Sequence, residues 1–409
     1  MAANESVRFV MRLFAKHYRE AQLFMPERFA KREFGFMFFD RSFVIRHTGF
    51  QSRASLKKYL VENTPSHVYY SSAYYEKPSA PSMAEKKWLG ADLIFDLDAD
   101  HIKGSANLPF PDMLNAVKKE VMRLLDDFIL ADFGFSPKEV RVVFSGGRGY
   151  HIHISHPSVL HLRSHERREI VDYITGTGLD IDWVFPKELF EVSKVGDRLH
   201  TKSKRRMAKL TDGGWLARTR RGIDDLFQKL EGMQQEERVN YLWRLCSESG
   251  IPYGRKSIEG LDSELFVPHG GRRGIDKMRQ DDNFEVFSSD RYLNQFLEII
   301  KRITAVEIAG ETDEPVTSDV KRLIRLPSSI HGKTGFEVVS MQRDDLDDFD
   351  PFVDAVPEAF GDNEVNIHCK EESRLELKGK SYVLKEGDNS VPEYVAVHAI
   401  CRKLASIKN

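Results

Sequence analysis

The chain has 409 residues, which is enough to bury a large core and corresponds to about two to three domains of ordinary size. Its 63 acidic and 61 basic residues nearly cancel, so the net charge indicates no polyanionic partner. Any nucleic-acid surface must therefore be a local basic patch. A charged fraction of 30% with an apolar fraction of 41% excludes an intrinsically disordered chain.

The cysteines and the apolar segments indicate the cellular compartment of the protein. The three cysteines, Cys246, Cys369 and Cys401, lie far apart and form no Cys-x-x-Cys pair, which argues against a disulfide scaffold and a cysteine-rich zinc site. The N-terminus has no signal-peptide pattern, and no apolar run reaches the roughly 18 residues of a membrane span. We expect a protein of the reducing cytoplasm that does not bind membranes.

The first 75 residues contain three patterns. Apolar residues at helical spacing predict an amphipathic helix over residues 7–25. Residues 32–46 are typical of two strands joined by a polar turn, and residues 66–75 are aromatic and rich in strand formers. Glu33 and Arg46 stand on the mostly apolar hairpin, and by themselves they indicate solvated charges at a sheet edge.

A buried strand that carries two carboxylates is predicted at residues 93–98. Because strand side chains alternate, Asp96 and Asp98 project from the same face, and such close like charges favour a divalent metal between them. The alternative is an acidic strand end on a solvated surface. A calcium loop is excluded, since His101 replaces its turn glycine and Asn107 replaces its bidentate glutamate.

The elements after this strand follow an α/β pattern. Residues 114–128 trace one apolar face of a helix, and residues 140–144 form a second strand. Strand, helix and strand, with an acidic pair at the end of the first strand, predict an α/β fold with the site at the edge or face of the sheet. Further helices are predicted at residues 164–174 and 292–303.

A helical insertion is predicted at residues 184–265, because helical patterns, including one at residues 185–192, prevail there with little strand signal. A basic cluster in this region is typical of a solvated loop, and it is also the best candidate for contact with a template backbone. The cluster consists of Lys202, Lys204, Arg205, Arg206 and Lys209.

A second motif, Ser-Gly-Gly-Arg-Gly-Tyr-His, occupies residues 145–151. Its glycines permit a tight turn with exposed amides that would cradle a phosphate, and Arg148 would add a bidentate contact. The motif lacks the Gly-Lys-Ser/Thr ending of a P-loop. His151 and His153 lie on one face of the following strand, where metal binding, phosphate contact and a structural role are all open. The neighbouring Gly-Arg-Gly favours phosphate.

A third motif runs from residue 323 to 335 and ends in Ile-His-Gly-Lys-Thr-Gly. Arg325, His331 and Lys333 are side chains of the kind that bind phosphate, placed around a turn. Asp313 precedes the motif, and no pattern singles it out. The remaining residues predict short strands and a closing helix with a capping box of Ser390 and Glu393, ending near residue 405.

The acidic strand at residues 93–98 is the first of three motifs. In their order and spacing, these motifs resemble the catalytic small subunit of the archaeal and eukaryotic type of DNA primase, and their sequences are closest to those of archaeal members. Residues 32–36, 87–90 and 392–397 share the resemblance, which therefore spans nearly the whole chain. It implies a fold of mixed sheets flanked by helices, in the α/β or α+β class. We expect the catalytic core at residues 1–183 and 266–409, separated by the helical insertion.

The resemblance also assigns roles to single residues. Asp96, Asp98 and Asp313 match the catalytic carboxylates that bind two Mg²⁺ or Mn²⁺ ions, and His153 is expected to be structural. Glu33 and Arg46 match residues near the nucleotide. The residues that match those holding the incoming triphosphate are Ser145, Arg148, His151, Arg325, His331 and Lys333.

The activity implied is nucleotidyl transfer, the synthesis of short primers from nucleoside triphosphates on a single-stranded DNA template, with a primase large subunit as partner. Many relatives carry a zinc knuckle after the acidic strand, but residues 100–133 contain no cysteine, so we expect no structural zinc. The alternatives are a primase-like repair or gap-filling polymerase, a metal-dependent phosphodiesterase, and a nucleic-acid-binding subunit with a vestigial site. The three carboxylates argue against the last.

Overall fold

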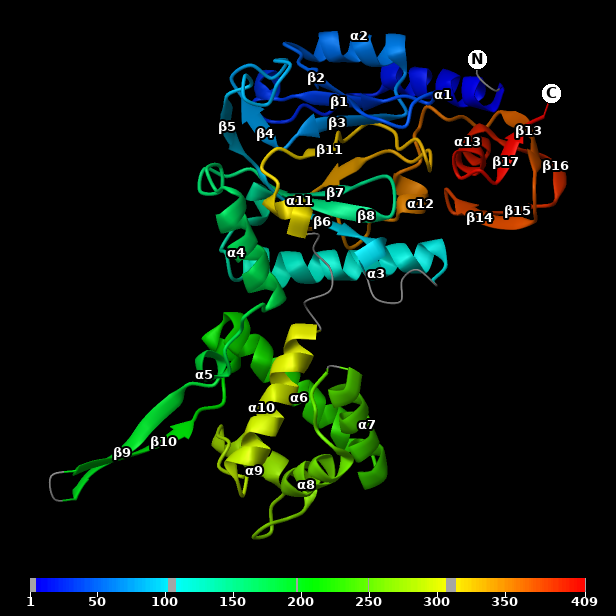
Figure 1. The fold of residues 1–409 in the computed structure, drawn as a ribbon. Helices are drawn as coiled ribbons and strands as arrows, with labels where there is room; N and C mark the ends of the chain where they lie inside the picture. Colours follow the sequence, from blue (N-terminus) through cyan, green and yellow to red (C-terminus); the bar gives the residue numbers. More distant parts are fainter. Residues whose placement is uncertain (1–4, 102–107, 196–197, 249, 307–313, 409) are drawn as a thin grey trace. The chain divides into compact units, whose positions relative to one another are not determined.

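The computed structural model describes residues 5–101, 108–195, 198–248, 250–306 and 314–408 (Figure 1). The chain divides into two compact units. The first comprises Met1–Leu125, Phe135–Val171 and Glu311–Asn409, and the second comprises Asp126–Gly134 and Asp172–Gly310. None of the helices in these described ranges combines the length and the apolarity needed to cross a bilayer.

The first unit contains a four-stranded antiparallel sheet in the order β11-β3-β1-β2. Helices α1 (Glu5–Glu20) and α2 (Arg53–Asn63) lie on one side of it (Figure 1). The predicted N-terminal helix and hairpin are confirmed, although the helix ends at Glu20. The strands are β1 (Phe34–Met37), β2 (Ile45–Thr48), β3 (His67–Ser71) and β11 (Leu323–Arg325).

A second antiparallel sheet has the order β12-β7-β8-β6 and carries the predicted acidic strand at its edge. Helix α3 (Phe110–Arg123), continued by the π-helical turn η4 (Leu124–Leu130), packs against β6 and β8, and α4 (Ser164–Thr175) follows later. These predicted strands and helices are confirmed. The strands are β6 (Leu93–Asp98), β7 (Val140–Phe144), β8 (Gly149–Ile154) and β12 (Val339–Met341).

A buried polar layer joins the two sheets. Arg32, just before β1, forms an ion pair of 2.6 Å with Asp92, just before β6, and both side chains are almost completely buried. The hydroxyl of Tyr70 on β3 lies 3.2 Å from Nδ1 of His153 on β8. These two contacts pair buried polar groups of one sheet with those of the other, which helps to fix how the two sheets pack.

The C-terminal part of the first unit is built from short strands around one helix. The predicted capping box at Ser390 is wrong, because Ser390 lies in a strand and donates to Glu364 at 2.7 Å, across the pairing of β16 with β13. The helix instead begins at Glu393 and ends at Cys401. The elements are α12 (Pro351–Asp354), β13 (Glu364–Cys369), β14 (Ser373–Leu377), β15 (Lys380–Leu384), β16 (Gly387–Pro392), α13 (Glu393–Cys401) and β17 (Ala405–Ile407). Two further strands of this unit, β4 (Ala73–Tyr75) and β5 (Trp88–Ala91), pair with each other.

The second unit is mainly helical. Its core includes Phe227, Leu261, Ile275 and Phe296, so helices beyond residue 265 share one core with those before it. The predicted insertion limits of 184 and 265 stay a proposal. The helices are α5 (Ile181–Val184), α6 (Gly214–Glu231), α7 (Gln235–Glu248), α8 (Arg255–Phe266), α9 (Gly274–Asp281) and α10 (Asp290–Val306).

A hairpin of β9 (Lys187–Val195) and β10 (Arg198–Arg205) belongs to this unit, so the helix predicted at residues 185–192 is wrong. A short apolar pattern does not distinguish the repeat of a helix from the repeat of a strand. Here the segment forms a strand because it pairs with β10. The hairpin contains part of the basic cluster. Within that cluster Arg205 pairs with Asp182 at 2.5 Å, and Arg206 pairs with Asp212 at 2.9 Å.

Candidate active site

The two predicted metal ligands lie on the same face of β6. Asp96 and Asp98 are both partly exposed, whereas the alternating residue Leu97 is buried. In the antiparallel register with β8, Asp96 stands opposite His151 and Asp98 opposite Gly149. The Nε2 atom of His151 lies 3.4 Å from Oδ1 of Asp96. The second motif therefore lies directly beside the carboxylates.

Glycines allow this approach of the second motif. A Cβ atom on Gly149 would lie 2.3 Å from the carbonyl oxygen of Leu97, and Gly146 has a φ of +72°, in the left-handed region that glycine favours. The loop places Arg148 so that Nη2 lies 3.8 Å from Oδ1 of Asp98, and the same guanidinium pairs with Asp100. Arg148 is therefore a half-exposed cation at the rim of the carboxylate pair.

The third motif packs on the second, although about 180 residues separate them in sequence. The hydroxyl of Thr334 donates to the carbonyl of Gly146 at 2.5 Å. A Cβ atom on Gly147 would lie 3.1 Å from Nε2 of His331, so the His331 ring rests on the glycine loop. The exposed Lys333 is on the same turn. Two loops thus form one surface with amides, imidazoles and cations.

Arg325 reaches this surface from β11, the edge strand of the other sheet. Its Nη1 atom lies 2.8 Å from Nδ1 of His67 and 3.4 Å from the hydroxyl of Tyr69. Burial lowers the pKa of Arg325, and Tyr69 and then Asp96 and Asp98 oppose that shift, so the guanidinium lies within the field of both carboxylates.

The two predicted histidines are uncharged near neutral pH. Burial lowers the pKa of His331 well below its usual value, and the charge of Arg325 lowers it further. Burial also lowers the pKa of His151, with Asp96 acting in the opposite direction. Nδ1 of His331 accepts from the amide of Lys333 at 3.3 Å, which leaves the proton of the neutral ring on Nε2, beside the glycine loop.

A family model described as DNA primase small subunit matches residues 95–344, more than half of the chain and all of the site described above except the N-terminal residues. The chain belongs to the DNA primase small subunit family. The motif resemblance and the expected class of mixed sheets and helices are therefore confirmed.

Curated relatives from archaea extend this match over nearly the whole chain. The chain is 40% identical to the DNA primase small subunit PriS of Methanothrix thermoacetophila, over 96% of this chain and 97% of that protein. It is 39% identical to the protein of the same name from Methanococcoides burtonii, over 96% of each chain. A third, from Methanocella arvoryzae, is 38% identical over 98% of each chain.

Glu33 and Arg46 meet in the primase fold, but not as solvated edge charges. Glu33 is completely buried and accepts hydrogen bonds from Nε and Nη2 of Arg46 at 3.1 and 3.2 Å, and from the amide of His47 at 2.9 Å. Nζ of Lys86, also completely buried, lies 3.4 Å away. The expectation drawn from these residues alone was wrong for Glu33, because Arg46 and Lys86 neutralise it inside the protein, whereas Arg46 lies on the edge strand β2 and is about one third exposed.

The third carboxylate predicted for a primase metal site, Asp313, lies outside the described residues, as does part of the loop for which we expected no zinc. Helix α11 (Glu314–Ser318) packs against β6. Within the described ranges, no three His, Cys, Asp or Glu residues gather as a metal site. Asp96 and Asp98 fit Mg²⁺ or Mn²⁺, because both are partly exposed oxygen donors on one face.

Three residues of this region were missed by the sequence analysis: His67, Lys86 and Arg322. The charge of Arg322, together with that of Arg325, favours the neutral form of His151. His67 was included in a stretch predicted only as strand, and its neighbour Arg325 is 258 residues away in sequence. No local pattern marks such a pair, because the register of β3 with β11 creates it.

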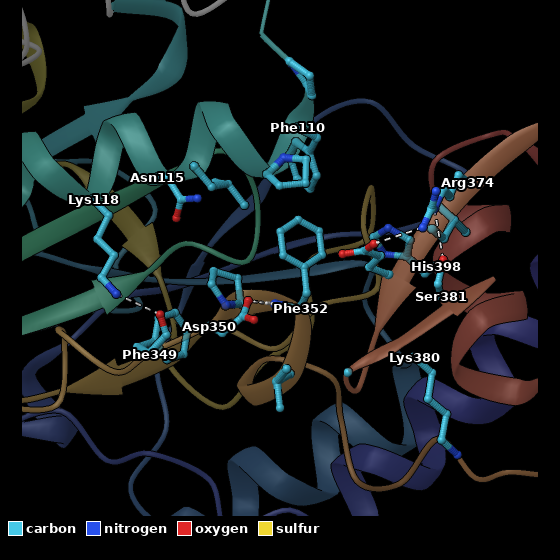
Figure 2. Close-up of a pocket in the computed structure, with 18 of the residues that line it drawn as sticks. Phe110, Asn115, Lys118, Phe349, Asp350, Phe352, Arg374, Lys380, Ser381 and His398 are labelled. Carbon is cyan, nitrogen blue, oxygen red and sulfur yellow. Dashed lines mark hydrogen bonds and ion pairs between the residues drawn. The ribbon is translucent and has the colours of Figure 1, made fainter. Parts of the chain in front are cut away.

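A cavity of about 920 Å³ lies elsewhere in the first unit, and none of the predicted site residues line it (Figure 2). Phe110, Phe352 and Arg374 are among its lining residues, as is His398. Nδ1 of His398 donates to the carbonyl of Thr334 at 2.7 Å. The C-terminal helix α13 thereby contacts the third motif.

Proposed function

We propose that this chain is the catalytic subunit of a DNA primase, a nucleotidyltransferase that makes short primers on single-stranded DNA. One observation carries the proposal. Two carboxylates on one face of β6 lie beside a surface of cations, neutral imidazoles and loop amides that comes from three segments far apart in sequence. Metal-dependent transfer of a nucleotide from a triphosphate requires both kinds of group side by side.

In this scheme the carboxylates bind the metal ions. Asp96 and Asp98, with Asp313, would hold two Mg²⁺ or Mn²⁺ ions, which when bound lower the pKa of the primer 3′-hydroxyl and stabilise the departing pyrophosphate. The strand geometry supports this role, because β6 fixes both side chains on one face before any ligand arrives.

The remaining residues would bind the triphosphate and stabilise the charge that develops on it. Arg325, Lys333 and Arg148 are the cations, and Ser145 and the loop amides add neutral donors. Neutral His331 offers its Nε2–H as a donor, and His151 stands beside Asp96. Their effect is electrostatic, from groups already in place, and no proton needs to pass through them.

Glu33 acts in this scheme through Arg46. Its two oxygens already accept hydrogen bonds from Arg46 and His47, and Lys86 balances its charge. Arg46 remains about one third exposed, so its guanidinium can reach a nucleotide.

The partners belong to the same proposal: a primase large subunit, a single-stranded DNA template and nucleoside triphosphates. The expected cytoplasmic location is supported by the three cysteines, all of which are free thiols.

The test is primer synthesis without a primer, on single-stranded DNA with labelled nucleoside triphosphates and Mg²⁺ or Mn²⁺, with and without a candidate large subunit. We compare wild type, Asp96→Asn/Asp98→Asn, and Asp388→Asn, a control in a half-exposed carboxylate of the C-terminal sheet. Short products that persist in the control and vanish in the double variant support the proposal.

Other results would redirect it. Extension of existing primers without any initiation would favour a repair polymerase. Release of nucleotides from a labelled strand in the absence of triphosphates would favour a phosphodiesterase. Synthesis that survives loss of both carboxylates would contradict the proposed site.

A further inference from the structure

His67 lies between Arg325 and the turn at Gly332, two groups of the kind that bind phosphate. It is the first residue of β3, and the residue is 4% exposed. Its Nδ1 atom lies 2.8 Å from Nη1 of Arg325 and 3.3 Å from the backbone nitrogen of Gly332. A guanidinium and an amide N–H are donors only, so Nδ1 accepts both hydrogen bonds and carries no proton.

Backbone pairing holds these partners around the ring. Arg325 on β11 stands opposite Tyr69 on β3, and the amide of Leu326 donates to the carbonyl of Val68 at 3.0 Å. A Cβ atom on Gly332 would lie 2.7 Å from the carbonyl oxygen of Ser66, so the third-motif turn rests directly on the start of β3. The acceptor is thus in place before any ligand binds.

The ring stays uncharged at this position. Burial lowers the pKa of His67 to about 3, and the charges of Arg325 and Lys333 lower it as well. An imidazolium here would lose both hydrogen bonds and repel two cations. The neutral ring also packs edge-on against the ring of His331, with centroids 4.8 Å apart.

Neutral acceptors leave the charge of Arg325 available. In the described part of the chain, no carboxylate lies within ion-pair distance of Arg325, and its hydrogen bonds go to His67 and Tyr69. A carboxylate in place of His67 would hold the guanidinium equally well, but it would cancel the charge that a triphosphate needs.

We propose that His67 is a positioning residue of the triphosphate site, whose unprotonated Nδ1 holds the Arg325 guanidinium and the Gly332 amide without neutralising Arg325. The inference rests on the proposed role of Arg325 in binding the triphosphate. It gives a reason for a buried polar ring at the junction of β3, β11 and the third-motif turn.

The test separates the acceptor from the bulk of the ring. In His67→Asn, Oδ1 takes the place of Nδ1, whereas His67→Leu keeps a similar volume and removes the acceptor. We measure KM for ATP, kcat and the melting temperature of each full-length variant. We expect His67→Leu to raise KM about tenfold with kcat within about twofold, because Arg325 is then ordered only on binding. We expect His67→Asn to return KM to within about threefold of wild type.

A third variant, His67→Gln, controls for polarity, because its amide reaches the Nε2 position and leaves Nδ1 unreplaced. It should resemble His67→Leu. Equal KM values for all three variants, or rescue by His67→Gln and not by His67→Asn, would overturn the inference. A lower melting temperature with an unchanged KM would also overturn it, since that is the signature of packing alone.

A double variant tests whether His67 acts through Arg325. Residues that act through one group are not additive, so His67→Leu should change KM little in an Arg325→Ala background. A full additional effect would contradict the inference.

Equilibrium titration with ATP distinguishes a failure here from a failure of the proposed function. If wild type binds ATP but makes no primers, the proposed activity fails, and the His67 variants can still be compared by their affinity for ATP. If wild type makes primers and His67→Leu binds ATP as tightly as wild type, the role of His67 fails alone.

Discussion

Arg32 is buried and Arg325 is partly buried in the same unit, and of the two only Arg32 is paired with a carboxylate in the described part of the chain. Arg32 pairs with Asp92 at 2.6 Å, donates to the carbonyls of Ser71 and Ser72 and stacks on Tyr74. Asp92 therefore neutralises the charge of Arg32 inside the protein. The hydrogen bonds of Arg325 go to a neutral ring and a hydroxyl, with Asp96 and Asp98 in its field but not in contact.

This difference separates a structural cluster from the proposed binding site. Cancelled charges fasten the two sheets together, and nothing in the Arg32 cluster calls for a ligand. Around Arg325, cations and carboxylates lie close together, and in the described part of the chain Arg325 itself forms no ion pair, which is costly unless a ligand completes the site. A metal-bound triphosphate would supply the matching charges: Asp96 and Asp98 would hold its metal ions, and Arg325 would bind its phosphate oxygens.

The largest effect should come from Asp96→Ala. Loss of a metal ligand should reduce synthesis by about a thousandfold or more, because the metal supplies several kcal/mol of transition-state stabilisation. The melting temperature should change little, since Asp96 is partly exposed and its neighbour His151 is already neutral. Primer synthesis and thermal unfolding of one preparation check both parts. Synthesis at the wild-type rate would remove Asp96 from the site.

The opposite outcome is expected for Arg32→Met. Leaving Asp92 buried without its cation should lower the free energy of unfolding by about 3–5 kcal/mol. The KM for ATP should stay near the wild-type value at temperatures where the variant is folded. Denaturant unfolding with parallel kinetics provides the comparison. A raised KM without loss of stability would show that the two arginine clusters do not differ as described.

Substitutions of Arg325 and Arg148, the two arginines proposed to bind phosphate, should raise KM for ATP by different amounts. Arg325→Ala should raise KM for ATP about a hundredfold, and Arg148→Ala about tenfold, because a desolvated, unpaired charge contributes more to binding than a rim charge. Arg148 is 47% exposed and already pairs with Asp100. Steady-state kinetics on the two variants decides this, and a larger effect at Arg148 would reverse the proposed order.

A smaller effect concerns Glu337, a partly buried carboxyl for which the described part of the chain shows no ion pair. Burial, and then the charge of Glu358, raise the pKa of Glu337 from 4.5 to about 7. The folded state therefore binds this proton more tightly than the unfolded state, and stability is lost as the pH rises from about 4.5 through about 7. Melting temperatures between pH 5 and 8 should fall less in Glu337→Gln than in wild type. Parallel curves would show that Glu337 does not contribute.

Much of the fold and of the candidate site could be predicted because their signals are local. The alternation of side chains along a strand predicted that Asp96 and Asp98 share one face, and both are partly exposed on the same face of β6. The glycines of the second motif indicated a close approach, and Gly149 meets the backbone of β6.

The rest depends on pairings between distant segments. Glu33 was expected to be solvated because Arg46 and Lys86 reach it only after folding. His67 gains its role from the register of β3 with β11. The hairpin at residues 187–205 is decided by its partner strand, not by its own pattern. Sequence periodicity contains no record of such partners.

The most direct test of the central claim, that the β6 carboxylates and the Arg325 surface form one nucleotidyl-transfer site, is incorporation of single labelled nucleotides on homopolymer templates with Mn²⁺. We expect ATP to be incorporated on poly(dT) and not on poly(dC), and incorporation to disappear in Asp96→Asn and to require far more ATP in Arg325→Ala. Incorporation that ignores the template, or that persists in Asp96→Asn, would contradict the claim.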